Sequence, residues 1–199
     1  MKKFILFLLI CTTLFSTKIN DVANIVGVRD NQIIGYSLVV GLNKTGDGTT
    51  SKFTLQSISN MLKAMNIDMN AVDIKSKNVA AVVVTAKLGS FSRQGDKLDV
   101  LVSSIGDAKS LEGGTLLMTP LKGVDGKIYA LAQGAVSIGG KNSRGAGSES
   151  HATAGLVFDG AIVEREIKID LYNQEYVTLS LKESNFKNSV AIQKAINSF

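Results

Sequence analysis

The chain has 199 residues, of which 45% are apolar and 20% are charged, and its formal net charge at neutral pH is +5. This length supports one domain or one and a half, and the apolar share is enough for an ordinary packed core. So small a positive charge, without a dense run of lysine and arginine, argues against nucleic-acid binding and favours an acidic protein partner.

The first 17 residues have the layout of a secretory signal. Two lysines follow the initiating methionine, an apolar run extends to Phe15, and the small residues Ser16 and Thr17 suit cleavage. This run is shorter than the roughly 20 apolar residues that a transmembrane helix needs. We therefore expect an exported protein, with a retained N-terminal anchor as the alternative.

The single cysteine of the chain, Cys11, lies inside this signal. Its position suggests lipidation, but Ile10 directly before it is too bulky for that processing step, so an apolar filler residue is favoured. The mature part then contains no thiol, and packing alone must hold it together.

Residues 18–138 are predicted to form the first domain. Residues 32–42 and 79–88 are β-branched and apolar, which is typical of buried strands. Between them, a polar and glycine-containing loop precedes residues 53–65, whose apolar side chains recur with helical spacing. This domain thus begins with two strands separated by one helix.

Three further strands complete the predicted first domain. Residues 98–102 alternate apolar and other side chains, as in a strand with one core face. Residues 115–121 and 127–132 flank the dipeptide Asp125-Gly126, which favours a hairpin turn. The fold class is therefore predicted to be α+β, with a strand-rich domain, hairpins and one clear helix.

A partial second β/α unit is predicted to follow. Residues 139–160 are rich in glycine and serine and are predicted to be a loop or linker. Residues 161–199 are predicted to hold strands over 161–169 and 176–181, then a helix from residue 185 that Ser184 caps. Because the helical pattern is cut off at its end, we expect a truncated product.

Catalysis is not favoured by the residues present. The one histidine, His151, lies in the glycine- and serine-rich segment, where a solvated loop residue is the better interpretation than a catalytic base. No zinc or calcium motif occurs, and residues 41–49 lack the full phosphate-loop pattern, so a tight glycine-dependent loop is favoured there. We expect no enzyme activity, no metal and no cofactor.

Two lysines are the candidate partner-contact residues. Lys77 precedes the strand predicted at 79–88, and Lys109 follows the strand predicted at 98–102. A sheet holds charges at its strand ends in position, so such lysines would present a fixed positive surface to a partner. Taken singly, each also fits a solvated surface lysine, and composition does not decide between the two interpretations.

Several longer strings, collinear along the chain, point to one known family. They are GVRDNQIIGY at 27–36, LVVGLN at 38–43, KNVAAV at 77–82, VSSIGDAKSL at 102–111, GGTLLMTPLKG at 113–123, YALAQG at 129–134 and GAIVERE at 160–166. In this order and at this length, they resemble the flagellar P-ring proteins. Strings of this kind are far more specific than a lone glycine motif.

The resemblance implies a structural subunit without catalytic activity. P-ring proteins assemble in the periplasm, at the peptidoglycan layer, into a ring around the distal rod of the flagellar basal body. Together with the L-ring protein they form a bushing in which the rod turns, and a periplasmic chaperone assists their assembly. The resemblance further implies that Lys77 and Lys109, which lie in matching strings, contact the rod or take part in assembly.

The chain departs from the family pattern at three places. Gly89 and Ser90 stand where two prolines are typical, and Ser37 stands where glycine is usual. The family also continues beyond residue 199 and there carries a cysteine pair, so a truncated chain is again expected. The alternative function is a monomeric periplasmic module that binds peptidoglycan, which the exported and mildly basic character would suit.

Overall fold

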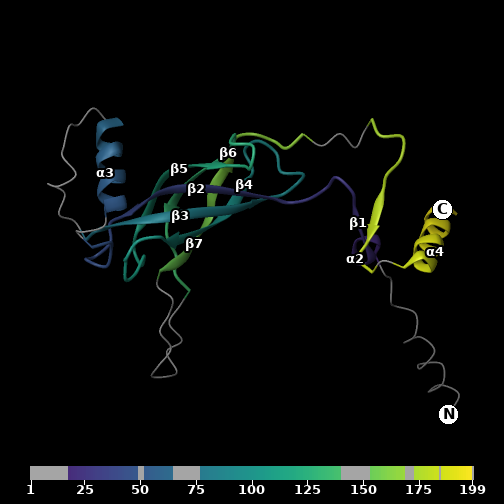
Figure 1. Ribbon diagram of the computed structural model, residues 1–199, viewed down its shortest axis with the longest axis horizontal. Helices are drawn as coiled ribbons and strands as arrows, with labels where there is room; N and C mark the ends of the chain where they lie inside the picture. Colours follow the sequence, from purple (N-terminus) through teal and green to yellow (C-terminus); the bar gives the residue numbers. More distant parts are fainter. Residues whose placement is uncertain are drawn as a thin grey trace, which may run out of the picture. The chain divides into compact units, whose positions relative to one another are not determined.

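The computed structural model describes residues 18–48, 52–64, 77–139, 153–168, 173–183 and 185–198. These residues belong to two compact units (Figure 1). Of the described residues, those from Asp30 to Lys168 form the barrel unit, and those in 18–29 and 173–198 form the split unit. The predicted secretory signal and His151 lie outside the described residues.

A closed antiparallel barrel forms the larger unit. Its six described strands follow the order β2-β3-β4-β7-β6-β5, so β5 pairs with β2 and closes the sheet. Closure leaves these strands without an unpaired edge. The bounds are β2 Asn31–Val40, β3 Val79–Leu88, β4 Lys97–Ser104, β5 Thr115–Lys122, β6 Ile128–Ala135 and β7 Ala154–Val163.

Small apolar side chains fill the inside of the barrel. Along β3, alternate residues from Ala80 to Leu88 are buried, as expected when successive side chains of a strand point to opposite faces. Neighbouring strands add Val100, Val102 and Leu121 to the same core. The strand-rich α+β class predicted from the sequence is confirmed. Packing of this core fixes the positions of the strand ends.

The hairpin predicted at Asp125-Gly126 is present. β5 and β6 pair antiparallel on either side of it, and Gly126 has φ +77°, a conformation that glycine adopts without steric cost. The Gly123 amide donates to the Lys127 carbonyl over 3.0 Å and closes the turn.

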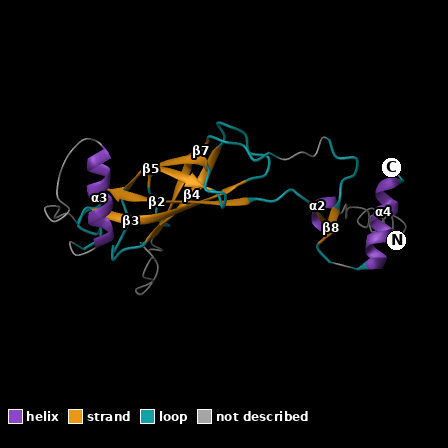
Figure 2. Cartoon of the chain, turned by 45° about the horizontal axis from the view of Figure 1, so that its top comes forward, coloured by secondary structure: helices purple, strands orange, loops and turns teal. Residues whose placement is uncertain are grey.

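The helix predicted at residues 53–65 is also present as α3, Lys52–Ala64. Figure 2 shows it beside one end of the β2 and β3 strands. Ile58, which is 8% exposed, packs with Leu38 of β2 and Ala81 of β3 in a second, smaller apolar cluster. The helix therefore covers the outside of the barrel at the end where β3 begins.

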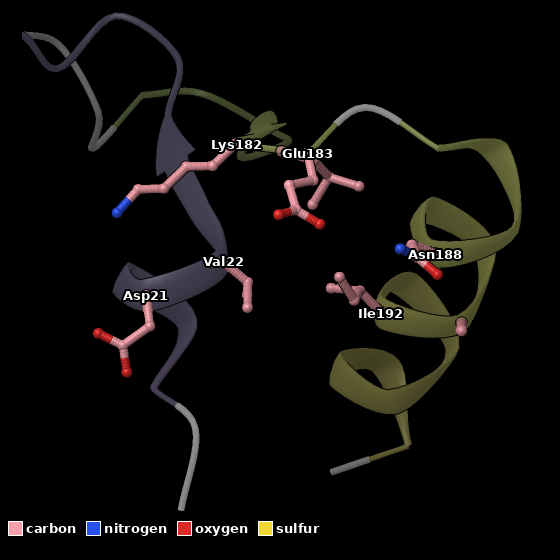
Figure 3. Close-up of a pocket in the computed structure, with 8 residues that line it drawn as sticks. Asp21, Val22, Lys182, Glu183, Asn188 and Ile192 are labelled. Carbon is pink, nitrogen blue, oxygen red and sulfur yellow. The ribbon is translucent and has the colours of Figure 1, made fainter.

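The split unit pairs two segments that are far apart in sequence. Its elements are α2 Ile19–Val22, β1 Ala23–Ile25, β8 Leu179–Leu181 and α4 Phe186–Asn197, and β1 pairs antiparallel with β8. A cavity of about 480 Å³ lies within this unit, with Val22 on one side and Ile192 of α4 on the other (Figure 3). No described residue of α4 is buried.

The α4 helix begins at Phe186, one residue later than predicted from the sequence. Asn185 is the N-cap, and its side-chain oxygen accepts a hydrogen bond from the Lys187 amide over 2.9 Å. This bond satisfies one of the free amides at the helix start. Ser184, the cap predicted from the sequence, lies outside the described residues.

The two units differ from the predicted domains 18–138, 139–160 and 161–199. β7 spans Ala154–Val163 and lies in the barrel between β4 and β6, so it crosses the boundary predicted at residue 160. The boundary predicted at residue 160 falls at a bulge, at which the register with β4 shifts and Asp159 takes φ +49°. Because the extra residues of a bulge break the alternation of side chains, the sequence does not show the residues on the two sides of it as one strand.

Among the described residues, no helix has the length and apolar character that crossing a membrane requires.

Replacement of Leu121 by alanine is expected to lower the free energy of unfolding by about 2–5 kcal/mol, because a buried leucine leaves a cavity. Leu121 is on β5 and is 0% exposed. Urea unfolding followed by circular dichroism measures the loss. Met118→Ala on the same strand is the matched control, since Met118 is 66% exposed. Equal losses in the two variants would contradict this placement of the core.

Candidate site for partner contact

The end of the barrel next to α3 brings several chain segments together. β2 ends at Val40, which lies in register with Val79 at the start of β3 and with Thr115 at the start of β5. The loop 41–48 leaves β2 at this point, and the loop that follows β4 returns to it. Both candidate lysines lie in these connections, one before β3 and the other after β4.

A single peptide group connects the two lysines. The Gly46 amide donates to the Lys77 carbonyl, and the Lys109 amide donates to the Thr45 carbonyl, each over 2.7 Å. The Thr45 carbonyl and the Gly46 amide belong to the same planar peptide unit. The Lys77 oxygen and the Lys109 nitrogen therefore lie within about 8 Å of each other.

Further hydrogen bonds tie loop 41–48 to the segment that contains Lys109. The Thr45 hydroxyl donates to the Ser110 carbonyl over 3.0 Å. The Gly48 amide donates to the Asp107 carboxylate over 2.8 Å. Bonds on both sides of Lys109 thus fix the backbone of this lysine against the loop.

Asp47 anchors the same loop from inside the protein. Its side chain is buried, and one carboxylate oxygen accepts from the Ala81 amide over 2.7 Å and from the Thr54 hydroxyl over 2.5 Å. Its own amide donates to the Val79 carbonyl over 2.8 Å. Asp47 therefore joins the loop to β3 and to α3 through two hydrogen bonds to one carboxylate oxygen.

Two glycines make this close packing possible. A Cβ on Gly46 would overlap the carbonyl oxygens of Lys77 and Val79, and a Cβ on Gly106 would overlap the Asp47 carboxylate. The second oxygen of that carboxylate, Oδ1, has no hydrogen-bond partner within the described residues. The interpretation of residues 41–49 as a loop that depends on glycine is confirmed for the described part, 41–48.

The side chains of Lys77 and Lys109 are exposed. The ion pairs of the described residues are Lys87–Asp30, Arg93–Glu166 and Lys127–Asp125, with nitrogen–oxygen distances of 2.7, 2.9 and 3.5 Å. None of these includes Lys77 or Lys109. Two ammonium groups on fixed backbones are suited to attract an acidic surface. No group of side chains that could hold a metal ion occurs among the described residues.

The structure places the two sequence-predicted site residues at one location, while their role stays a prediction. Sequence reasoning missed Asp47 and did not connect the glycine-containing loop with the lysines. A polar residue in a polar loop gives no sign of burial, so no pattern in the sequence would have distinguished Asp47 from a solvated aspartate.

Comparisons with known proteins give a consistent result. The family model described as flagellar P-ring protein matches residues 18–199. A flagellar P-ring protein of Sulfurimonas denitrificans is 78% identical over 192 residues, covering 96% of this chain and 54% of the relative. The protein of that name from Wolinella succinogenes is 67% identical over 190 residues, with coverages of 96% and 54%.

A Campylobacter jejuni protein of the same name is 59% identical over 197 residues, covering 99% of this chain and 57% of the relative. The chain therefore spans slightly more than half the length of these curated relatives.

Replacement of Gly46 by alanine is expected to destabilise the barrel by about 1–3 kcal/mol, because the added methyl group forces two carbonyl oxygens apart. Urea unfolding of the purified variant measures this change. Gly139→Ala is the matched control, since nothing lies within 4 Å of the methyl group there. The close approach at Gly46 would be disproved by a variant as stable as this control.

Replacement of Asp47 by alanine is expected to lower the free energy of unfolding by about 2–4 kcal/mol, because the Ala81 amide is left buried without an acceptor. Asp96→Ala is the control: the Asp96 carboxylate also accepts a backbone amide, that of Arg93 over 2.8 Å, but at an exposed turn. Thermal unfolding compares the two variants. A loss at Asp47 no larger than that at Asp96 would refute the anchoring role.

Proposed function

We propose that this chain, which belongs to the flagellar P-ring protein family, is a structural subunit of a ring around the distal rod of the flagellar basal body. In this role it is exported to the periplasm and performs no catalysis. The single observation that carries the proposal is the match to this family over residues 18–199, together with relatives up to 78% identical that bear the P-ring name. The names of these relatives favour a ring subunit over a peptidoglycan-binding module.

Ring formation requires the chain to bind copies of itself. A closed ring is built from head-to-tail contacts, in which one surface of a subunit meets a different surface of the next. The other partners that we propose are the distal rod, the L-ring protein, a periplasmic assembly chaperone and the peptidoglycan layer. All of them come from the family resemblance.

Lys77 and Lys109 are proposed to face the rod or to act in assembly. A bushing needs attraction between two surfaces without deep interlocking, because the rod must still turn. Long-range attraction between fixed positive charges and an acidic surface meets this need. The two hydrogen bonds of the Thr45–Gly46 peptide group, to the Lys77 carbonyl and from the Lys109 amide, are called the clamp below. The clamp supports this role, since it holds the backbones of both lysines at one end of the barrel.

Charge reversal of both lysines, Lys77→Glu with Lys109→Glu, is expected to reduce ring-bearing basal bodies by roughly tenfold or more, because like charges then face each other. Electron microscopy of isolated basal bodies counts the rings, and immunoblotting of the periplasmic fraction verifies export. The matched control is Lys97→Glu with Lys122→Glu. These two lysines are also exposed, and they lie at the other end of the strands. Normal rings in the first variant would refute the role of the two lysines.

A further inference from the structure

Lys44 adopts an unusual backbone conformation next to the clamp. Its φ is +60°, in the left-handed region, where glycine is favoured and asparagine is the next most tolerant residue. Its amide donates to the Leu42 carbonyl and to the Asn78 side-chain oxygen, each over 3.1 Å. These bonds fix the position of the Lys44 backbone beside Lys77, the neighbour of Asn78.

The backbone conformation does not explain why a lysine stands here. A residue held in a sparsely populated conformation points to a function of that residue when a more tolerant one would fold as well. The Lys44 side chain is exposed and takes part in none of the ion pairs of the described residues. The property that distinguishes it from glycine or asparagine is its positive charge.

The charges around this loop favour a negative partner. The Thr45–Gly46 peptide group is hydrogen-bonded to the backbones of Lys77 and Lys109. Lys44 directly precedes Thr45 in the sequence. The nearby carboxylate of Asp47 is buried and engaged with Ala81 and Thr54. Asp107 and Glu112 are exposed; the Asp107 carboxylate accepts the Gly48 amide, and the Glu112 amide donates to the Ser110 hydroxyl. Among the described residues named here, three exposed ammonium groups thus accompany two exposed carboxylates.

We propose that Lys44 is a third fixed cationic contact, which acts together with Lys77 and Lys109 on an acidic protein surface. This inference rests on the proposed function, because the acidic partner is the surface that those two lysines are proposed to face. It adds a residue that is strained in the backbone and exposed at the side chain. Lys44 binds the partner and does not support the fold.

The test uses two substitutions that separate charge from backbone. Lys44→Asn removes the charge and suits the left-handed conformation, so its midpoint of urea unfolding should equal or exceed that of the unchanged chain. Lys44→Arg keeps the charge. Binding of the purified full chain to immobilised poly-L-glutamate, at low ionic strength, is the measurement.

Lys44→Asn is expected to weaken this binding about two- to fivefold, as for the loss of one exposed ion pair. Lys44→Arg should bind like the unchanged chain, and the difference between the variants should vanish in about 1 M salt, where exposed charges are screened. The double reversal of Lys77 and Lys109 should weaken binding further. This pattern would support a set of three cations.

Other outcomes overturn the inference in distinguishable ways. If Lys44→Asn binds like the unchanged chain while the double reversal loses binding, the third contact is refuted and the proposed role of Lys77 and Lys109 survives. If neither variant changes binding, both are refuted. Binding to vesicles of phosphatidylglycerol but not to poly-L-glutamate would replace the protein partner by a lipid surface and would also refute the inference.

Discussion

The peptide group between Thr45 and Gly46 makes one hydrogen bond to Lys77 and another to Lys109. Such a group is rigid and planar, so it sets the spacing of the two lysines more firmly than long side chains could. Gly46 allows this contact because any larger residue would overlap the Lys77 carbonyl. Asp47 then anchors the neighbouring backbone to the buried side of the barrel. The positions of the two lysines therefore depend on backbone hydrogen bonds of the Thr45–Gly46 peptide group.

The closed barrel supplies the frame for this constraint. Its strands pair on both sides, and their ends at Val40, Val79 and Thr115 lie in register. Connections that leave such a frame at one end are held close together even when they are far apart in sequence. The proposed ring subunit would gain from this arrangement, because attraction between fixed charges and the rod needs no moving or interlocking parts.

Much of the barrel was predictable from the sequence, because β3 and α3 carry strong apolar periodicity and Asp125-Gly126 is a specific turn pattern. The continuity of β7 across residue 160 was not predictable, since the bulge at Asp159 interrupts the alternation that marks a strand. Both candidate lysines were singled out by their positions next to predicted strands, and the family strings then favoured a role in partner contact. The proximity of the two lysines was not predictable, because it depends on backbone hydrogen bonds, which do not require particular side chains. The charge of Lys44 was equally uninformative without its backbone conformation.

Amide hydrogen exchange at Gly46 and Lys109, followed by NMR in the folded chain, tests the central claim most directly. Both amides donate to the clamp, so both should exchange far more slowly than an exposed loop amide. In Gly46→Ala, the two amides should lose protection together, while the amides of the barrel core stay protected. Rapid exchange at either amide in the unchanged chain would contradict the account, because the two lysines would then have no common anchor.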